Sequence, residues 1–385
     1  SIGGAGCGTS GCTAGNGTIN TGSGGGGAEG SAGTGGTGGN GGKGIVIIRY
    51  LTSSDITATG GTITTISAPA TTVKPTSVQD NSILVEKDTG NRYWKTGDYW
   101  LRGGKPYRGV FLGGNTGADS NVIDYITIDT LGNATDFGDL LAANQAFNEG
   151  VNSDTRGVVA GGYPSGGDTN VIQYITISTA GNATDFGDLT SARRASSGVT
   201  NQTRGCIGGG AVINNIDYIT IATTGNSLDF GDLITATYQT HGCNSDTRGI
   251  YGGSHTAGAE ISYITISSLG NATDFGDALT TFAYNGSGNS DTRGVFVTGS
   301  ATNVLEYITI ATTGNSLDFG DLTTTSGAGL MTVNSIDRMC FGGGNRPALS
   351  NIIDFITTAT LGNATDFGDL TVARGDSSGC CQDGL

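Results

Sequence analysis

The four-residue sequence Asp-Phe-Gly-Asp occurs six times and is the feature that most constrains the fold of this chain. The copies begin at residues 136, 185, 229, 274, 318 and 366, so that neighbouring copies are 44 to 49 residues apart. A period of this size is typical of stacked units that bury their apolar faces only against one another. The sequence therefore predicts a repeat architecture over residues 105–385.

Each repeat contains four short apolar segments separated by turn signals. One segment opens with Arg-Gly, as in Arg108-Gly-Val-Phe-Leu-Gly-Gly114, and the next alternates, as in Ile123-Asp-Tyr-Ile-Thr-Ile128. A Gly-Asn turn, the Asp-Phe-Gly-Asp segment and a fourth segment such as 145–152 follow, and Ser-Asp-Thr leads to the next Arg-Gly. Four short strands per unit predict the blade of a β-propeller, and helical periodicity is missing.

The ends of the repeat region predict how the ring closes. The first unit has no innermost strand of its own, because the residues before Arg108 do not match the other units. The segment 370–379 aligns with 189–198, which precedes an innermost strand. We therefore expect the C-terminal strand to complete the first blade, which also removes the exposed sheet edges.

The repeat unit resembles the kelch repeat. A Gly-Gly pair ends the second strand, an aromatic residue occupies the third strand, and another lies on the fourth, where this chain has Phe and kelch usually has Trp. The third-strand residues are Tyr125, Tyr174, Tyr218, Tyr263, Tyr307 and Phe355. The resemblance implies an all-β, six-bladed kelch-like β-propeller closed by the C-terminal strand.

Two further segments precede the repeats. Residues 1–51 are glycine-rich, with 21 glycines in residues 1–44, which suits either a flexible linker or a packed lattice of polyproline-II-like strands. The end of this segment, 38–50, resembles the glycine-rich domains of bacteriophage tail fibres and adhesins, and this resemblance favours the ordered form. Residues 52–104 read as a linker and a β-hairpin module, with strands in 81–100 around a turn at 88–91.

Composition excludes several classes of protein. From residue 106 onward the chain has 10 Arg against 27 Asp and Glu, a net charge of −17, which argues against nucleic acid and anionic membranes as partners. It lacks an apolar run of eighteen residues, so membrane insertion is not expected. Seven cysteines without a Cys-x-x-Cys and only two histidines predict neither a zinc site nor a cofactor. The chain starts without an initiator Met or a recognisable signal peptide, so nothing indicates ordinary export.

Several short motifs have bland explanations. Asp-Phe-Gly also occurs in kinases, but six copies indicate a role in each blade, and we expect the repeated Arg to neutralise a nearby Asp. Calcium at this Asp-rich edge stays open, because oxygen ligands are plentiful. Asn-Ala-Thr at 133, 182, 271 and 363 fits a glycosylation sequon, but a turn asparagine at positive φ also explains it. Arg374-Gly-Asp376 matches an integrin motif, which chance also produces.

The cysteines give a test of the strand register. Cys206 and Cys340 each lie two residues after the repeated Arg, while Cys243 and the aligned Cys380 fall in innermost strands. We expect each pair, 206 with 243 and 340 with 380, to face across an interface between blades. Either disulfides or buried thiols are compatible with the sequence.

The function expected from the sequence is binding rather than catalysis. Galactose oxidase, which shares the kelch propeller, needs copper ligands that include histidines, and sialidase propellers carry Trp-containing boxes that this repeat region lacks. The glycine-rich resemblance implies a phage virion structural protein of tail-fibre or adhesin type, located in the virion. Its expected partners are other virion proteins and a host receptor or glycan, with a homotrimer as the favoured assembly. A bacterial surface or secreted carbohydrate-binding protein is the alternative, followed by a sugar-active enzyme.

Binding is expected on one face of the propeller. The Ser-Asp-Thr and Gly-Asn turns are nearly uniform and share a face, whereas the loops between second and third strands and between blades differ in every repeat. Variable loops on a rigid scaffold are where partners are usually recognised. The candidate ligand-binding residues on this face are Tyr163, Arg193, Arg194, Tyr238, His255, Phe282, Tyr284, Arg346 and Arg374.

Overall fold

The computed structural model describes most of the repeat region. The described ranges are 107–145, 150–281, 286–290, 292–298, 302–326, 329–335 and 337–381, together with the backbone of three short strands between residues 83 and 102. The chain divides between residues 105 and 106. Our predictions for residues 1–51 and for the linker lie outside the described residues.

A small antiparallel sheet forms in the segment before the repeats. β1 (Ile83–Val85) pairs with β2 (Arg92–Thr96), as expected for the predicted hairpin, and β2 also pairs with β3 (Tyr99–Arg102). The predicted hairpin thus extends to a third strand that we had not separated from the second. The turn expected at 88–91 lies outside the described residues.

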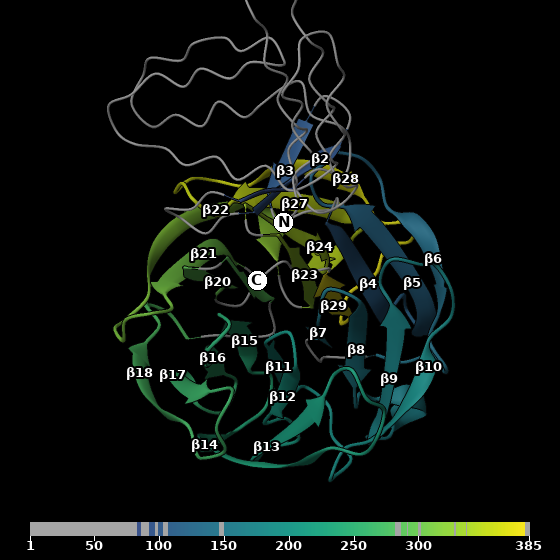
Figure 1. Cartoon of the computed structure of the whole chain (residues 1–385). Helices are drawn as coiled ribbons and strands as arrows, with labels where there is room; N and C mark the ends of the chain where they lie inside the picture. Colours follow the sequence, from purple (N-terminus) through teal and green to yellow (C-terminus); the bar gives the residue numbers. More distant parts are fainter. Residues whose placement is uncertain are drawn as a thin grey trace, which may run out of the picture. The chain divides into compact units, whose positions relative to one another are not determined.

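The repeat region forms a six-bladed β-propeller, as predicted. Six four-stranded antiparallel sheets stand around a common axis, with strands such as β7, β11, β15, β23 and β29 closest to it (Figure 1). From the innermost strand outward, blade 1 consists of β29 (Ser378–Cys381), β4 (Arg108–Asn115), β5 (Asp119–Thr127) and β6 (Thr135–Asp139). Blade 2 consists of β7 (Val151–Asn152), β8 (Arg156–Ala160), β9 (Val171–Thr176) and β10 (Thr184–Asp188). Blade 3 consists of β11 (Ser197–Thr200), β12 (Arg204–Gly208), β13 (Ile213–Thr220) and β14 (Leu228–Thr237).

The remaining three blades follow the same order. Blade 4 consists of β15 (His241–Asn244), β16 (Arg248–Ser254), β17 (Gly258–Thr265) and β18 (Thr273–Asp277). Blade 5 consists of β19 (Ser287–Asn289), β20 (Arg293–Val297), β21 (Thr302–Thr309) and β22 (Leu317–Ser326). Blade 6 consists of β23 (Leu330–Asn334), β24 (Arg338–Gly343), β27 (Ile352–Thr357) and β28 (Thr365–Asp369), and its loop holds the short hairpin β25 (Asn345–Arg346) and β26 (Ala348–Leu349). The short helical turn η1 (Pro164–Gly166) lies between β8 and β9.

The predicted closure by the C-terminal strand is confirmed. β29 pairs antiparallel with β4, with Cys380 opposite Val110. The outer part of the ring closes as well, because the Asp369 amide of blade 6 donates to Asn133 Oδ1 of blade 1 at 3.1 Å. The last part of the chain is therefore joined to blade 1 both near the axis, through β29, and at the outer strands, through Asp369 and Asn133.

The hydrophobic core consists of the interfaces between neighbouring blades. One buried cluster, for example, combines Val110, Ile123 and Phe137 of blade 1 with Val159 and Ile175 of blade 2. Both faces of each blade are covered, so polar residues of an alternating strand can also be buried. Burial therefore does not follow the simple apolar-in, polar-out pattern of a one-sided sheet.

In the residues that the structure describes, the repeated Arg contacts an aromatic ring and a backbone carbonyl, where we expected an ion pair with Asp. In blade 1 its guanidinium carbon lies 4.3 Å from the centroid of the Tyr125 ring, and Nη1 donates to the Ile177 carbonyl of blade 2 at 2.9 Å. The same bond to the following blade recurs for Arg156, Arg204, Arg248, Arg293 and Arg338. A cation–π contact and a carbonyl thus explain a residue present in every blade.

The Asp-Phe-Gly-Asp sequence also joins neighbouring blades. The Asp139 amide donates to Asn182 Oδ1 in the Gly-Asn turn of the next blade at 3.1 Å. Gly138 has φ 149°, and a Cβ at this position would lie 2.6 Å from the carbonyl of Gly181. The turn asparagines are therefore needed for their side-chain acceptor; positive φ belongs to the preceding glycine, contrary to our expectation.

The cysteine prediction is correct in register and wrong in contact. Cys206 and Cys340 pair with Val199 and Val333, and Cys243 and Cys380 occupy innermost strands, as the alignment requires. The five cysteines that the structure describes are buried thiols rather than members of disulfides. Cys206 and Cys243 belong to different core clusters, as do Cys340 and Cys380, because each packs in its own interface between blades.

Candidate functional site

The variable loops lie together on one face, and backbone bonds connect them. The Tyr163 amide, between the second and third strands of blade 2, donates to the Gln145 carbonyl in the loop between blades 1 and 2 at 3.0 Å. The His255 amide of blade 4 donates in the same manner to the Tyr238 carbonyl at 3.1 Å. In blades 2 and 4, the loop between the second and third strands is therefore bonded to the loop that enters the same blade.

Four residues of this surface form a cluster around one guanidinium group. The Arg194 Cζ atom lies 3.9 Å from the centroid of the Tyr163 ring and 5.8 Å from that of Tyr238. Arg194 Nε donates to the Tyr238 hydroxyl at 3.2 Å, and Nη1 donates to Asp168 Oδ1 at 2.7 Å. We call Tyr163, Asp168, Arg194 and Tyr238 the Arg194 cluster.

The Arg194 cluster is open to solvent, and its arginine stays charged. The side chains of Arg194 and Asp168 are 28% and 32% exposed. The hydrogen bond to the Tyr238 hydroxyl, with help from Asp168, raises the pKa of Arg194 above its usual value. An ion pair this exposed contributes only about 0–1 kcal/mol to folding. The cluster therefore matters little for stability, and a partner can reach its aromatic rings, its donors and its acceptors.

Three predicted site residues are buried beneath this surface. Arg193 has no exposed side-chain surface and pairs with Asp217 at 3.0 Å, and Arg374 pairs in the same way with Asp124 at 3.1 Å. Arg346 on β25 is also buried, and it pairs with Asp354. These arginines stabilise loops from inside and do not present their charge to a partner.

The carboxylates that hold these arginines share one position on the third strand. This position is Asp124, Gln173, Asp217, Ser262, Glu306 and Asp354 in blades 1 to 6. A buried Arg is found in blades 1, 3 and 6, the three that have Asp there. This pairing was a signal in the sequence that we did not use.

In blade 5 the carboxylate at this third-strand position is bound mainly by hydroxyl groups instead of an arginine. Glu306 is fully buried and accepts hydrogen bonds from Thr280 Oγ1 at 2.7 Å, Ser316 Oγ at 2.6 Å and the Leu279 amide at 2.9 Å. Thr298 Oγ1 donates to the same carboxylate at 3.1 Å. Four donors satisfy the charge locally, so the residue is structural.

The other predicted residues divide into exposed and undescribed ones. His255 is exposed next to the Arg194 cluster. Phe282 and Tyr284 lie outside the described residues. The Arg374-Gly-Asp376 motif does not present its arginine to a receptor, because Arg374 is 0% exposed, and burial raises the pKa of Asp376 to about 6.

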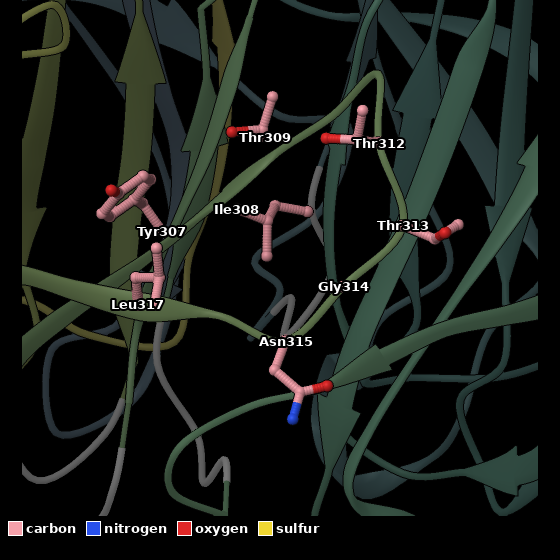
Figure 2. A pocket seen from close by; sticks show the side chains of 8 residues that line it. All are labelled: Tyr307, Ile308, Thr309, Thr312, Thr313, Gly314, Asn315 and Leu317. Atoms are coloured by element: carbon pink, nitrogen blue, oxygen red, sulfur yellow. The ribbon is translucent and has the colours of Figure 1, made fainter.

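Two other features of the described region are weaker candidates. Figure 2 shows a small recess at the third-to-fourth-strand turn of blade 5, lined by Tyr307, Thr309, Asn315 and Leu317 among others. It lies at a turn whose sequence is nearly the same in every blade, so it offers little specificity.

Within the described ranges, His, Cys, Asp and Glu side chains do not gather in a group of three that could hold a metal ion. In the same ranges we find no helix of the length and apolarity that a membrane span requires.

Comparisons with known proteins do not name a family. No family model matches the chain, and no curated protein matches its sequence. The structure establishes the fold as a six-bladed propeller. The family of the chain has to be proposed from the repeats themselves.

Proposed function

We propose that this chain is a virion structural protein of the tail-fibre or adhesin type, whose propeller binds a host surface glycan through the Arg194 cluster. The observation behind this proposal is the pair of tyrosine rings around a solvent-accessible Arg–Asp pair on the face with non-repeating loops. Aromatic rings combine a large apolar surface with a polar group, and neighbouring donors and acceptors fix the orientation of a ligand.

The charge of the propeller favours a neutral ligand of this kind over nucleic acid or an anionic membrane. Its net charge of −17 from residue 106 onward would repel both. The glycine-rich segment, whose end resembles that of phage tail-fibre domains, supports a place in a virion. In this proposal the repeats are kelch-like, the other partners are virion proteins, and the protein is a homotrimer that binds without catalysis.

The binding face can be tested with two matched pairs of substitutions. Tyr163→Ala with Tyr238→Ala should lower binding to host cells or purified surface glycans at least about tenfold, because stacking surface is lost. Asn182→Ala with Asn271→Ala changes the opposite, repetitive face and should leave binding unchanged. Binding is measured by flow cytometry and biolayer interferometry after circular dichroism has shown that both variants are folded. Loss of binding only in the asparagine variant would reject the proposed face.

Mass spectrometry of purified phage particles tests the location. The proposal expects the protein in the particles at a fixed ratio to the tail proteins. Detection only on the surface of bacteria or in culture medium would favour the alternative, a bacterial carbohydrate-binding protein. Light scattering coupled to size exclusion tests the trimer, for which the expected mass is three times 38.6 kDa.

A further inference from the structure

The Arg194 cluster places a charged donor directly beside a charged acceptor at the surface. Arg194 Nη1 and Asp168 Oδ1 are 2.7 Å apart, and each side chain keeps close to a third of its surface exposed. The Tyr238 hydroxyl, which accepts from Arg194 Nε at 3.2 Å, holds the guanidinium group in position. A ligand group at this spot meets both partners together.

Few chemical groups suit such a pair. A hydroxyl group can accept from the arginine and donate to the aspartate at the same time. A carboxylate or sulfate can only accept, so it would gain from Arg194 and be repelled by Asp168. An ammonium group can only donate and faces the opposite conflict. The pair is therefore complementary to hydroxyl groups.

The surroundings add further negative charge. Asp119 lies under the same loop, where its Oδ2 accepts from the Ser165 amide at 2.7 Å and its Oδ1 accepts from Gln145 Nε2 at 2.6 Å. The formal charges of Asp119, Asp168 and Arg194 give this part of the surface one more negative than positive charge. Juxtaposed like charges are a common means of excluding a wrong partner.

We propose that the Arg194 cluster selects neutral, hydroxyl-rich sugars and uses Asp168 to exclude their acidic counterparts. This inference rests on the proposed glycan-binding function and names the class of sugar. The tyrosine rings contact the apolar face of the sugar, and neighbouring hydroxyl groups bridge Asp168 and Arg194. Asp168 is thus a specificity-determining residue.

The probes for the test are matched sugars that differ only in charge. Oligosaccharides of glucose, galactose and mannose are compared with the corresponding oligo-uronates, in biolayer interferometry with the full-length protein. The wild type should bind at least one neutral member, and its uronate at least about tenfold more weakly. Asp168→Asn should weaken neutral binding and strengthen uronate binding, so that the preference disappears or is reversed.

A second aspartate supplies the control. Asp136→Asn makes the same change of charge at an exposed position on β6, the outermost strand of blade 1, and should leave the preference as in the wild type. If the wild type binds uronates as well as neutral sugars, or if Asp168→Asn keeps the preference, the inference is wrong while glycan binding stands. If neither sugar class binds to the wild type while the protein is folded, the proposed function fails and the inference fails with it.

Discussion

Replacing Arg374 with methionine should destabilise blade 1 far more than a single surface substitution would. The guanidinium group is fully buried, pairs with Asp124 at 3.1 Å, and donates to the carbonyls of Val122 and Phe111 at 3.0 and 3.2 Å. Methionine leaves the Asp124 carboxylate buried, with Thr371 as its remaining donor in the structure. Breaking one partner out of a buried pair costs about 3–5 kcal/mol.

Thiol labelling measures this cost locally. Cys380 and Cys381 lie on β29, the strand that follows Arg374, and burial keeps both from reagents. A loss of about 3 kcal/mol in local opening should raise their labelling rate by more than about a hundredfold. Cys206 in blade 3 serves as the internal reference, because its rate should change much less.

The equivalent pair in blade 3 provides a matched control. Arg193→Met breaks the same type of contact, with Asp217, but in a blade whose strands are continuous in sequence. It should expose Cys206 and leave Cys380 protected. In blade 1, adding Asp124→Leu to Arg374→Met removes the buried charge and should recover at least about 2 kcal/mol. Equal labelling of Cys380 in wild type and Arg374→Met would refute the reasoning.

Two further predictions concern repeated and buried positions. Gly231→Ala should lower the free energy of unfolding by about 1–3 kcal/mol in urea, because φ of Gly231 is 147° and a Cβ would lie 2.6 Å from the Gly270 carbonyl. The control Gly117→Ala should cost less, because a Cβ at Gly117 would meet open space. Equal losses in the two variants would contradict this role for the repeated glycine. Burial lowers the pKa of His241 to about 4, so the unfolded chain takes up a proton that the folded chain does not. The contribution of neutral His241 to the free energy of unfolding should be fully present above about pH 6.5, and it should fall by about 3 kcal/mol as the pH is lowered to 4. The variant His241→Gln should therefore lose less stability in acid than the wild type. Identical acid unfolding curves for the two proteins would refute the assignment.

The ring could be predicted from the sequence because its determinants repeat. Six copies of Asp-Phe-Gly-Asp set the number of blades, and the match between 370–379 and 189–198 assigned the closing strand. The chemistry of the repeats was harder to predict. The repeated Arg bonds to a carbonyl of the next blade, a partner that no local pattern reveals.

The candidate site was less predictable because its residues do not repeat. Tyr163, Arg194 and Tyr238 were chosen as exposed loop residues and do lie together, but Asp168 was missed in a loop with little pattern. Arg193 was chosen with its neighbour Arg194, although one is buried and the other exposed. Adjacent residues at the end of a loop point in different directions, and a one-dimensional sequence does not distinguish them.

The position of β4 in blade 1 has a mechanical consequence. The chain enters the ring at this strand, which is paired on one side with β29 and on the other with β5. A pulling force transmitted along the chain before Tyr107 thus acts on a strand held by two ladders of hydrogen bonds. Separation by shear has to break bonds of both ladders together, whereas a strand at a sheet edge can peel off bond by bond. The attachment point of the ring is therefore suited to sustained tension.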